Sequence, residues 1–294
     1  MKMREGEIEI SVSLVKKLIR EQFPKWADLP IEPVPSMGTD NALFRLGDTT
    51  QIRLPRIDWA ANNIDKEFTW LPQIASFIST PITTPLYKGN PIEEYPYHWA
   101  IYDWLEGENP KSCCADCGSD FVENLANFLK ETREINLPDS PRASRGTPLI
   151  KRDEPTRKAL KELAGVVDTR LAAHIWDNAL KIPYWDKPPV WVHGDLLPGN
   201  ILIKDGKLSG VIDFSCMGLG DPACDLIVAW NLLDAKRRML FRDLLPVDEN
   251  TWIRGQAWAM SQSLLILPYY KDTNPGLVET ANYTLEEIFS DFGN

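Results

Sequence analysis

The stretch from Trp191 to Asp225, WVHGDLLPGNILIKDGKLSGVIDFSCMGLGDPACD, constrains the fold of this chain more than any other. Asp205-Gly206 separates two apolar segments, and both residue types tolerate the positive φ angles of a two-residue type I′ turn. Ile201–Ile203 before the turn and Leu208–Ile212 after it have the length and composition of short buried strands. The sequence therefore predicts a β-hairpin at the centre of this stretch.

The predicted hairpin brings together two side chains that bind hard cations. Counting back from the turn places Asn200 opposite Val211, and Asp213 lies two residues beyond Val211, so both side chains are expected on one face. Diagonal neighbours in such a ladder lie about 7–8 Å apart, within joint reach of one ion. Mg²⁺ prefers one or two protein oxygens together with phosphates and water. We therefore predict that Asn200 and Asp213 bind Mg²⁺.

The loop that leads into the hairpin contains a candidate base. His193, Asp195 and Asn200 have the H-x-D-x-x-x-x-N spacing that is typical of the catalytic loops of kinases. Asp195 is close enough to the predicted metal site to accept a proton from a substrate hydroxyl. The order of these elements, with the segment GDPACD following up to Asp225, favours this interpretation over a hairpin with ordinary surface side chains.

The segments VHGDLLPGN, VIDF and GDPACD resemble the aminoglycoside phosphotransferase family, which is similar to the choline kinases. The resemblance implies an α+β, two-lobed, protein-kinase-like fold with a small β-rich N-terminal lobe and a larger, mainly helical C-terminal lobe. It also implies transfer of the γ-phosphate of ATP or GTP to a hydroxyl. From the family's pattern, His193 is expected to brace the catalytic loop and Asp225 to hydrogen-bond the backbone of that loop.

The N-terminal part contains a candidate phosphate-binding loop. Small and polar residues around Gly38 and Asn41 precede two predicted strands, Ala42–Leu46 and Gln51–Leu54. A turn of small residues between strands can lie over nucleotide phosphates, because backbone N–H groups make the contacts. We therefore assign Gly38 and Asn41 to nucleotide binding, and a plain hairpin is the alternative.

Arg53 occupies the position on the second strand where kinases of this fold usually carry the lysine that holds the α- and β-phosphates. Arginine is always charged and can bind phosphate in a bidentate manner, so the exchange is chemically workable. Arg56 is the competing candidate. Apolar spacing predicts a helix over Asp58–Phe77, and Glu67 on this helix is the candidate partner of Arg53. The alternative for Glu67 is a solvated helix charge.

The resemblance places the hinge between the lobes at Tyr97–Glu108. It implies that the main chains of Asp103 and Leu105 contact adenine. We therefore expect residues 1–105 to form the nucleotide-binding lobe with a leading helix, and residues 106–294 to form the catalytic and acceptor-binding lobe.

Composition bears on the cellular location and the partners that we expect for the chain. The chain has 294 residues, five cysteines, a net charge of −10 and a charged N-terminus without an apolar signal region. It contains no stretch of about 18 apolar residues. These features predict a cytoplasmic enzyme with reduced thiols and without a nucleic-acid or membrane partner. The acidic charge is also compatible with a polycationic acceptor, although many proteins are this acidic.

We predict an aminoglycoside-type antibiotic as the small-molecule acceptor. A metabolic kinase for an amino alcohol, a sugar or an amino acid is one alternative, and a nucleotide-binding pseudoenzyme is another. A scaffold has no need to keep Asp195, Asn200 and Asp213, which argues against the pseudoenzyme. Carboxylates on the closing helices are either candidates for binding substrate amines or solvated helix charges: Asp248, Glu249, Glu279, Glu286 and Glu287.

Overall fold

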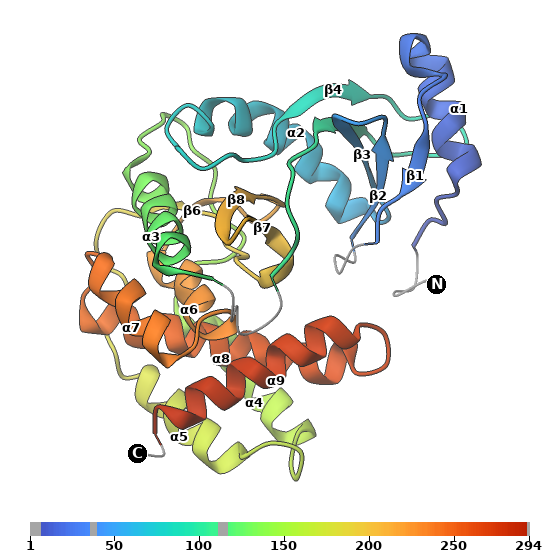
Figure 1. Cartoon of the computed structure of the whole chain (residues 1–294). Helices are drawn as coiled ribbons and strands as arrows, with labels where there is room; N and C mark the ends of the chain where they lie inside the picture. The colour runs from blue at the N-terminus through green and yellow to red at the C-terminus, as the bar shows by residue number, and fades with distance from the viewer. Residues whose placement is uncertain (1–6, 36–39, 111–116, 293–294) are drawn as a thin grey trace.

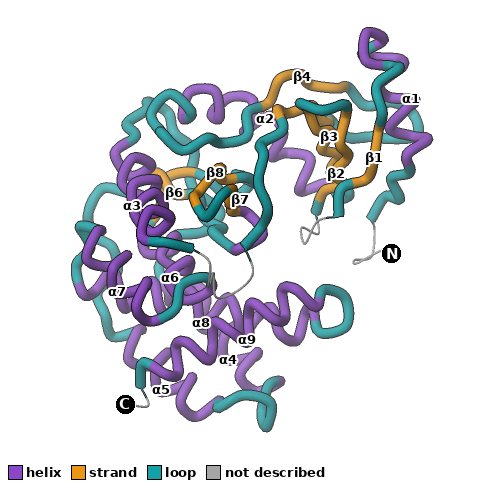
Figure 2. The backbone as a smooth tube through the Cα atoms, viewed as in Figure 1, coloured by secondary structure: helices purple, strands orange, loops and turns teal. Residues whose placement is uncertain are grey.

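The computed structural model describes residues 7–35, 40–110 and 117–292, which form an N-terminal lobe built on a sheet and a mainly helical C-terminal lobe (Figure 1). The elements of the N-terminal lobe are α1 (Val12–Gln22), β1 (Ile31–Pro33), β2 (Asn41–Leu46), β3 (Thr50–Pro55), α2 (Asp58–Ile74), β4 (Pro85–Gly89) and β5 (Trp99–Asp103). The strands form one antiparallel sheet in the order β1-β2-β3-β5-β4. Figure 2 shows the strands of this sheet gathered in this lobe together with α1 and α2, whereas most of the other lobe is helical.

Alternating apolar residues explain how the first lobe folds. Ala42, Phe44 and Leu46 of β2 are buried, whereas the residues between them are only partly buried. Helix α1 covers the sheet with an apolar stripe that includes Leu18, and Ser11 caps the helix by accepting a hydrogen bond from the Leu14 N–H (3.2 Å). This packing holds in place the sheet whose strand β3 carries Arg53, the candidate phosphate-binding cation.

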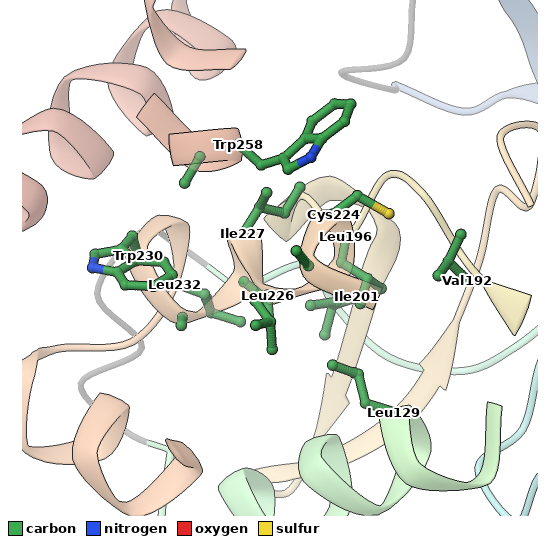
Figure 3. Close-up of a cluster of buried hydrophobic side chains, with 14 of the residues drawn as sticks. Leu129, Val192, Leu196, Ile201, Cys224, Leu226, Ile227, Trp230, Leu232 and Trp258 are labelled. Carbon is green, nitrogen blue, oxygen red and sulfur yellow. The ribbon is translucent and has the colours of Figure 1, made fainter. Parts of the chain in front are cut away.

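The C-terminal lobe surrounds the predicted hairpin with helices. Its elements are α3 (Ser119–Glu134), α4 (Asp153–Glu162), α5 (Thr169–Ala179), β6 (Val190–Val192), β7 (Ile201–Lys204), β8 (Lys207–Val211), β9 (Gly218–Gly220), α6 (Val228–Asn231), α7 (Ala235–Leu244), α8 (Glu249–Tyr270) and α9 (Pro275–Ser290). Figure 3 shows part of a cluster of buried apolar side chains that includes Leu129 of α3, Leu196 of the catalytic loop, Ile201 of β7 and Trp258 of α8. This core holds the catalytic loop against the longest helix.

The hairpin forms as predicted, but its register differs by one residue. Asp205 and Gly206 have positive φ angles of 52° and 74°, as a type I′ turn requires. Val211 pairs with Ile201, not with Asn200, because the register shifts at a bulge after Leu202. The extra residue on β8 is Ser209, whose Oγ donates to the main-chain oxygen of Glu106 (2.9 Å). The predicted pairing of Asn200 with Val211 is therefore wrong.

A loop over residues 141–146 runs beside β9 and is held by its main chain. The Leu219 N–H donates to the Pro141 carbonyl (2.8 Å), and the Ala143 N–H donates to the Leu219 carbonyl (3.1 Å). A Cβ atom at Gly218 would lie only 2.6 Å from the Ala143 nitrogen, so the approach of the two segments requires glycine there. The backbone path of this loop is thus fixed independently of its exposed side chains.

The cysteines differ in part from expectation. Cys216 and Cys224 are free thiols, whereas Cys117 is disulfide-bonded, so the prediction of reduced thiols is wrong at that position. The other two cysteines, Cys113 and Cys114, lie outside the described residues. None of the helices in the described ranges is long and apolar enough to cross a membrane.

Candidate active site

Side chains from both lobes line a single cavity of about 520 Å³. Arg53 reaches it from β3 and Asn41 from the start of β2, while Asp195, Asn200 and Asp213 reach it from the catalytic loop and the hairpin. The structure therefore brings together the candidate base, the candidate metal ligands and the candidate phosphate-binding cation.

The carboxylate of Asp195 is held in place at the cavity wall. Gln262 of α8 donates from Nε2 to Asp195 Oδ1 (3.2 Å), and the Arg145 guanidinium contacts the same oxygen. Asn200 donates from Nδ2 to the Asp195 main-chain oxygen (2.8 Å), which closes the loop back on itself. These contacts restrict the rotamer of Asp195 and leave its Oδ2 for a hydroxyl group.

Two oxygens at the cavity fit Mg²⁺. The Nδ2 of Asn200 already donates to the loop, which leaves its Oδ1 as a ligand atom, and Asp213 gives only its Oδ1 to Arg53 (3.0 Å). Burial alone would raise the pKa of Asp213, but attraction by Arg53 and hydrogen bonds from Ser215 outweigh it, so the pKa lies below its ordinary value. Asp213 is therefore ionised at neutral pH, as a metal ligand must be.

The described residues contain no cluster of three or more His, Cys, Asp or Glu side chains that could hold a metal by themselves. Mg²⁺ held by one carboxylate and one amide would not need such a cluster, because nucleotide phosphates and water would supply the remaining ligands. Asp213 also has a φ angle of 60°, a conformation that residues other than glycine rarely adopt and that tends to occur at functional sites.

His193 and Asp225 brace the catalytic loop from behind. His193 Nδ1 accepts from the Asp195 N–H (3.1 Å), so its ring proton lies on Nε2, which faces the Ile212 carbonyl (3.0 Å). The carboxylate of Asp225 accepts from the N–H groups of His193 (2.8 Å) and Gly194 (2.7 Å). Both side chains are buried. Their hydrogen bonds to the loop backbone are of the kind that the resemblance implied for these two positions.

Arg53 lies between two carboxylates. Its Nη1 contacts both oxygens of Glu67 on α2 (2.9 and 3.1 Å), and its Nη2 contacts Asp213. Tyr102 donates its hydroxyl to Glu67, which is completely buried. Burial raises the pKa of Glu67 in spite of the Arg53 charge and the Tyr102 hydrogen bond. The predicted pair of Arg53 and Glu67 is therefore present, whereas the competing candidate, Arg56, does not line the cavity.

The amide of Asn41 lies against Arg53. With its oxygen turned toward the guanidinium, Asn41 accepts from Nη2 and Nε at 3.1 Å each. Asn41 thus positions the cation at the cavity. Gly38, the other predicted residue of this loop, lies outside the described residues.

The predicted hinge residues are placed less favourably for nucleotide contact. The Asp103 N–H donates to the Thr84 carbonyl (3.2 Å), and its own carbonyl accepts from the side-chain Nε2 of Gln51 (3.1 Å), so both main-chain groups already have partners within the lobe. Neither Asp103 nor Leu105 lines the cavity. The nearby linker is fastened to β7 by hydrogen bonds between Glu108 and Ile203 (2.9 Å each).

The cavity residues that were not anticipated from the sequence include three polar ones on the side of the helical lobe: Arg145, Arg152 and Gln262. They come from the loop beside β9, from the turn before α4 and from the middle of α8, and no short motif marks any of them. Conversely, the candidate carboxylates on the closing helices do not line the cavity: Asp248, Glu249, Glu279, Glu286 and Glu287. Asp248 caps α8, and Glu249 and Glu287 pair with arginines.

Residues 31–258, which span both lobes and include Arg53, Asp195 and Asp213, match the model of the phosphotransferase enzyme family. The chain belongs to this family. The chain is similar to an aminoglycoside 3′-phosphotransferase of Salmonella typhimurium, with 27% identity over 190 residues, or 60% of this chain and 61% of that one. Another, from Escherichia coli, is 26% identical over 202 residues, covering 64% and 65%. The chain thus matches less than two thirds of each of these relatives.

Solved structures confirm the two-lobed, kinase-like α+β fold. The GDP and kanamycin complex of APH(2")-IIia superposes with a TM-score of 0.75 at 17% identity, covering 94% of this chain and 98% of that one. A macrolide 2′-phosphotransferase type I superposes with a TM-score of 0.65 at 15% identity, covering 95% and 98%. This family transfers phosphoryl groups to hydroxyl groups.

A buried ion pair involves Asp221, near the end of the stretch from Trp191 to Asp225, and its loss should destabilise the folded protein. Asp221 contacts Arg254 of α8 (2.7 Å), and both side chains are nearly inaccessible, at 6% and 4%. Asp221→Ala leaves the guanidinium with neutral partners, so we expect the free energy of unfolding to fall by about 3–5 kcal/mol. Urea denaturation followed by circular dichroism measures this change.

The matched control is the exposed pair Lys158–Glu162, whose nitrogen and oxygen lie 3.9 Å apart. Lys158→Ala should change the free energy of unfolding by less than about 1 kcal/mol. Equal effects of the two substitutions would show that the Asp221 pair does not support the fold.

Proposed function

We propose that this chain transfers the γ-phosphate of ATP or GTP to a hydroxyl of a small-molecule acceptor, with Asp195 as the base. The observation that carries the proposal is the convergence of Asp195, Asn200, Asp213 and Arg53 on one cavity. A scaffold that only binds nucleotide would not require this combination of base, metal ligands and cation.

In the proposed reaction, each residue has a separate task. Asp195 orients the acceptor hydroxyl and takes its proton, a contribution of about 10²–10⁴-fold to the rate. Arg53, held by Glu67, adds positive charge beside the nucleotide phosphates. Mg²⁺, which Asn200 and Asp213 would hold, neutralises charge on the phosphate oxygens when bound. Positioning and electrostatics account for most of the remaining acceleration.

The comparisons support a range of donors and acceptors. Related structures hold GDP, ADP or ATP, so either ATP or GTP is a suitable donor. The names of the sequence relatives support an aminoglycoside-type antibiotic as the first acceptor class to test, and a macrolide kinase is also a structural neighbour. Because ATP and GTP are cytoplasmic metabolites, the proposal keeps the cytoplasmic location expected from the sequence.

The proposal is tested by release of ADP or GDP with a panel of aminoglycosides, macrolides, amino alcohols and hydroxy acids. We expect turnover with at least one class and complete loss on chelation of Mg²⁺ with EDTA. Mg-nucleotide binding that raises the melting temperature, without turnover of any acceptor, would instead support the pseudoenzyme. Failure to bind Mg-nucleotide would refute the proposed function.

A further inference from the structure

Two arginines line the cavity on the side of the helical lobe. Arg145 lies on the loop beside β9 and contacts Asp195. Arg152 ends a short 3₁₀ turn, donates from Nε to Ser261 Oγ (2.9 Å) and lies over the Trp258 ring, 4.4 Å from the ring centroid. Helix α8 therefore supports Arg152 through Ser261. The next residue of the helix, Gln262, contacts Asp195.

Arg152 is a cation without a local counter-charge. Within the part of the chain that the structure describes, no carboxylate lies within ion-pair distance of its guanidinium. Burial and the repulsion by Arg145 lower the pKa of Arg152 to about 10. An unpaired, partly desolvated charge is costly, and an anion placed beside it would relieve this cost.

The neighbouring wall favours an apolar body, and its described part offers no carboxylate to an amine. Its described side chains are mostly apolar or aromatic: Leu265, Ile266, Tyr269, Tyr270, Leu277 and Thr280. Neither α8 nor α9 contributes a carboxylate to the lining that the structure describes. Of the carboxylates that line the cavity, Asp195 and Asp213 are paired with Arg145 and Arg53, and Asp40 lies just before β2 in the N-terminal lobe. A polycation entering here would meet two guanidinium groups.

We infer that Arg145 and Arg152 form an anion-binding subsite that takes an acidic group of the acceptor. The preferred acceptor is then a hydroxyl compound with an apolar body and a carboxylate, phosphate or sulfate group, and not a polycation. Because Arg145 also contacts Asp195, an anion bound at the subsite would hold the acceptor beside the base. This inference rests on the proposed function, in which Arg53 and not Arg152 serves the nucleotide.

Sulfate is a suitable probe because it tests the subsite before any acceptor is known. Protein saturated with Mg-ADP is titrated with sodium sulfate by calorimetry, against sodium chloride at equal ionic strength. We expect saturable sulfate binding in the natural protein. Arg152→Gln should raise the Kd at least about tenfold, because charge-assisted hydrogen bonds are lost, and Arg152→Lys should retain part of the affinity. Arg142→Gln, an exposed arginine of the same loop, should leave the Kd unchanged.

The outcomes separate the subsite from its alternatives. Absence of saturable sulfate binding in the presence of Mg-ADP, or equal loss in Arg142→Gln, overturns the inference. Sulfate that competes with ADP, together with a raised KM for Mg-ATP in Arg152→Gln, assigns the anion site to the nucleotide and overturns it as well. Protein that does not bind Mg-ADP refutes the proposed function, which is a different result.

A second measurement compares acceptors of matched structure. Aromatic hydroxy acids and their methyl esters differ in one charge, and kanamycin supplies the polycation. We expect the acid to have a kcat/KM at least about tenfold above that of its ester, and Arg152→Gln to remove this ratio without changing the KM for Mg-ATP. Kanamycin turned over faster than every acid would overturn the inference while confirming the kinase.

Discussion

Replacement of Asp195 by asparagine is expected to lower kcat by about 10²–10⁴-fold, the usual contribution of a general base. Asparagine has the same size and can still accept from Gln262, so the loop should keep its path. The fall in kcat would therefore come from loss of the base and not from a change of structure, and the Kd for Mg-ATP should change little. Steady-state release of ADP gives kcat, and calorimetry gives the nucleotide Kd.

The matched control is the same exchange at Asp205, in the turn of the same hairpin. Asp205 is exposed, and asparagine tolerates its positive φ angle of 52°. Asp205→Asn should leave kcat within about a factor of two, because surface substitutions away from the site usually have small effects. An Asp195→Asn enzyme as active as this control would remove Asp195 from the reaction.

Asp213→Asn is the second large effect that we expect, because it removes the negative charge from the proposed metal site. Loss of several kcal/mol of metal-supplied stabilisation corresponds to a fall of at least about 10³-fold in kcat/KM. The Mg²⁺ concentration for half-maximal rate should rise at the same time. Titration of the rate with MgCl₂ at constant ionic strength measures both changes.

Asparagine also tolerates the positive φ angle of 60° at this position, so backbone strain is not the cause of the expected loss. An Asp213→Asn enzyme with the Mg²⁺ dependence of the natural protein would exclude Asp213 as a ligand. Circular dichroism and the melting temperature verify that the variant is folded.

The parts of the site that could be predicted from the sequence are those whose geometry is local. Asp195, Asn200 and Asp213 lie on one loop and hairpin, and the turn at Asp205 determines where the hairpin reverses direction. The pair of Arg53 and Glu67, 14 residues apart, follows from a strand next to a helix together with the family resemblance. Short-range spacing carries enough information in these cases.

The parts that could not be predicted depend on distant contacts. Arg145 is 50 residues from Asp195, and Gln262 is 67 residues from it, so no spacing rule joins them. The register error arose from Ser209, which bulges toward the main chain of Glu106, 103 residues away. The contacts of Asp103 with Thr84, 19 residues away, likewise cannot be seen in the sequence.

The manner in which the loop over residues 141–146 is attached has a consequence for the evolution of acceptor choice. Main-chain bonds to β9, and a glycine at Gly218, determine where this loop runs. The path of the loop therefore does not depend on the side chain at position 145, which contacts Asp195 and the Gly194 carbonyl. If the acceptor binds as proposed, exchange of Arg145 would change what surrounds Asp195 and the acceptor while the backbone of the site keeps its path, so that acceptor choice could change without a change of fold.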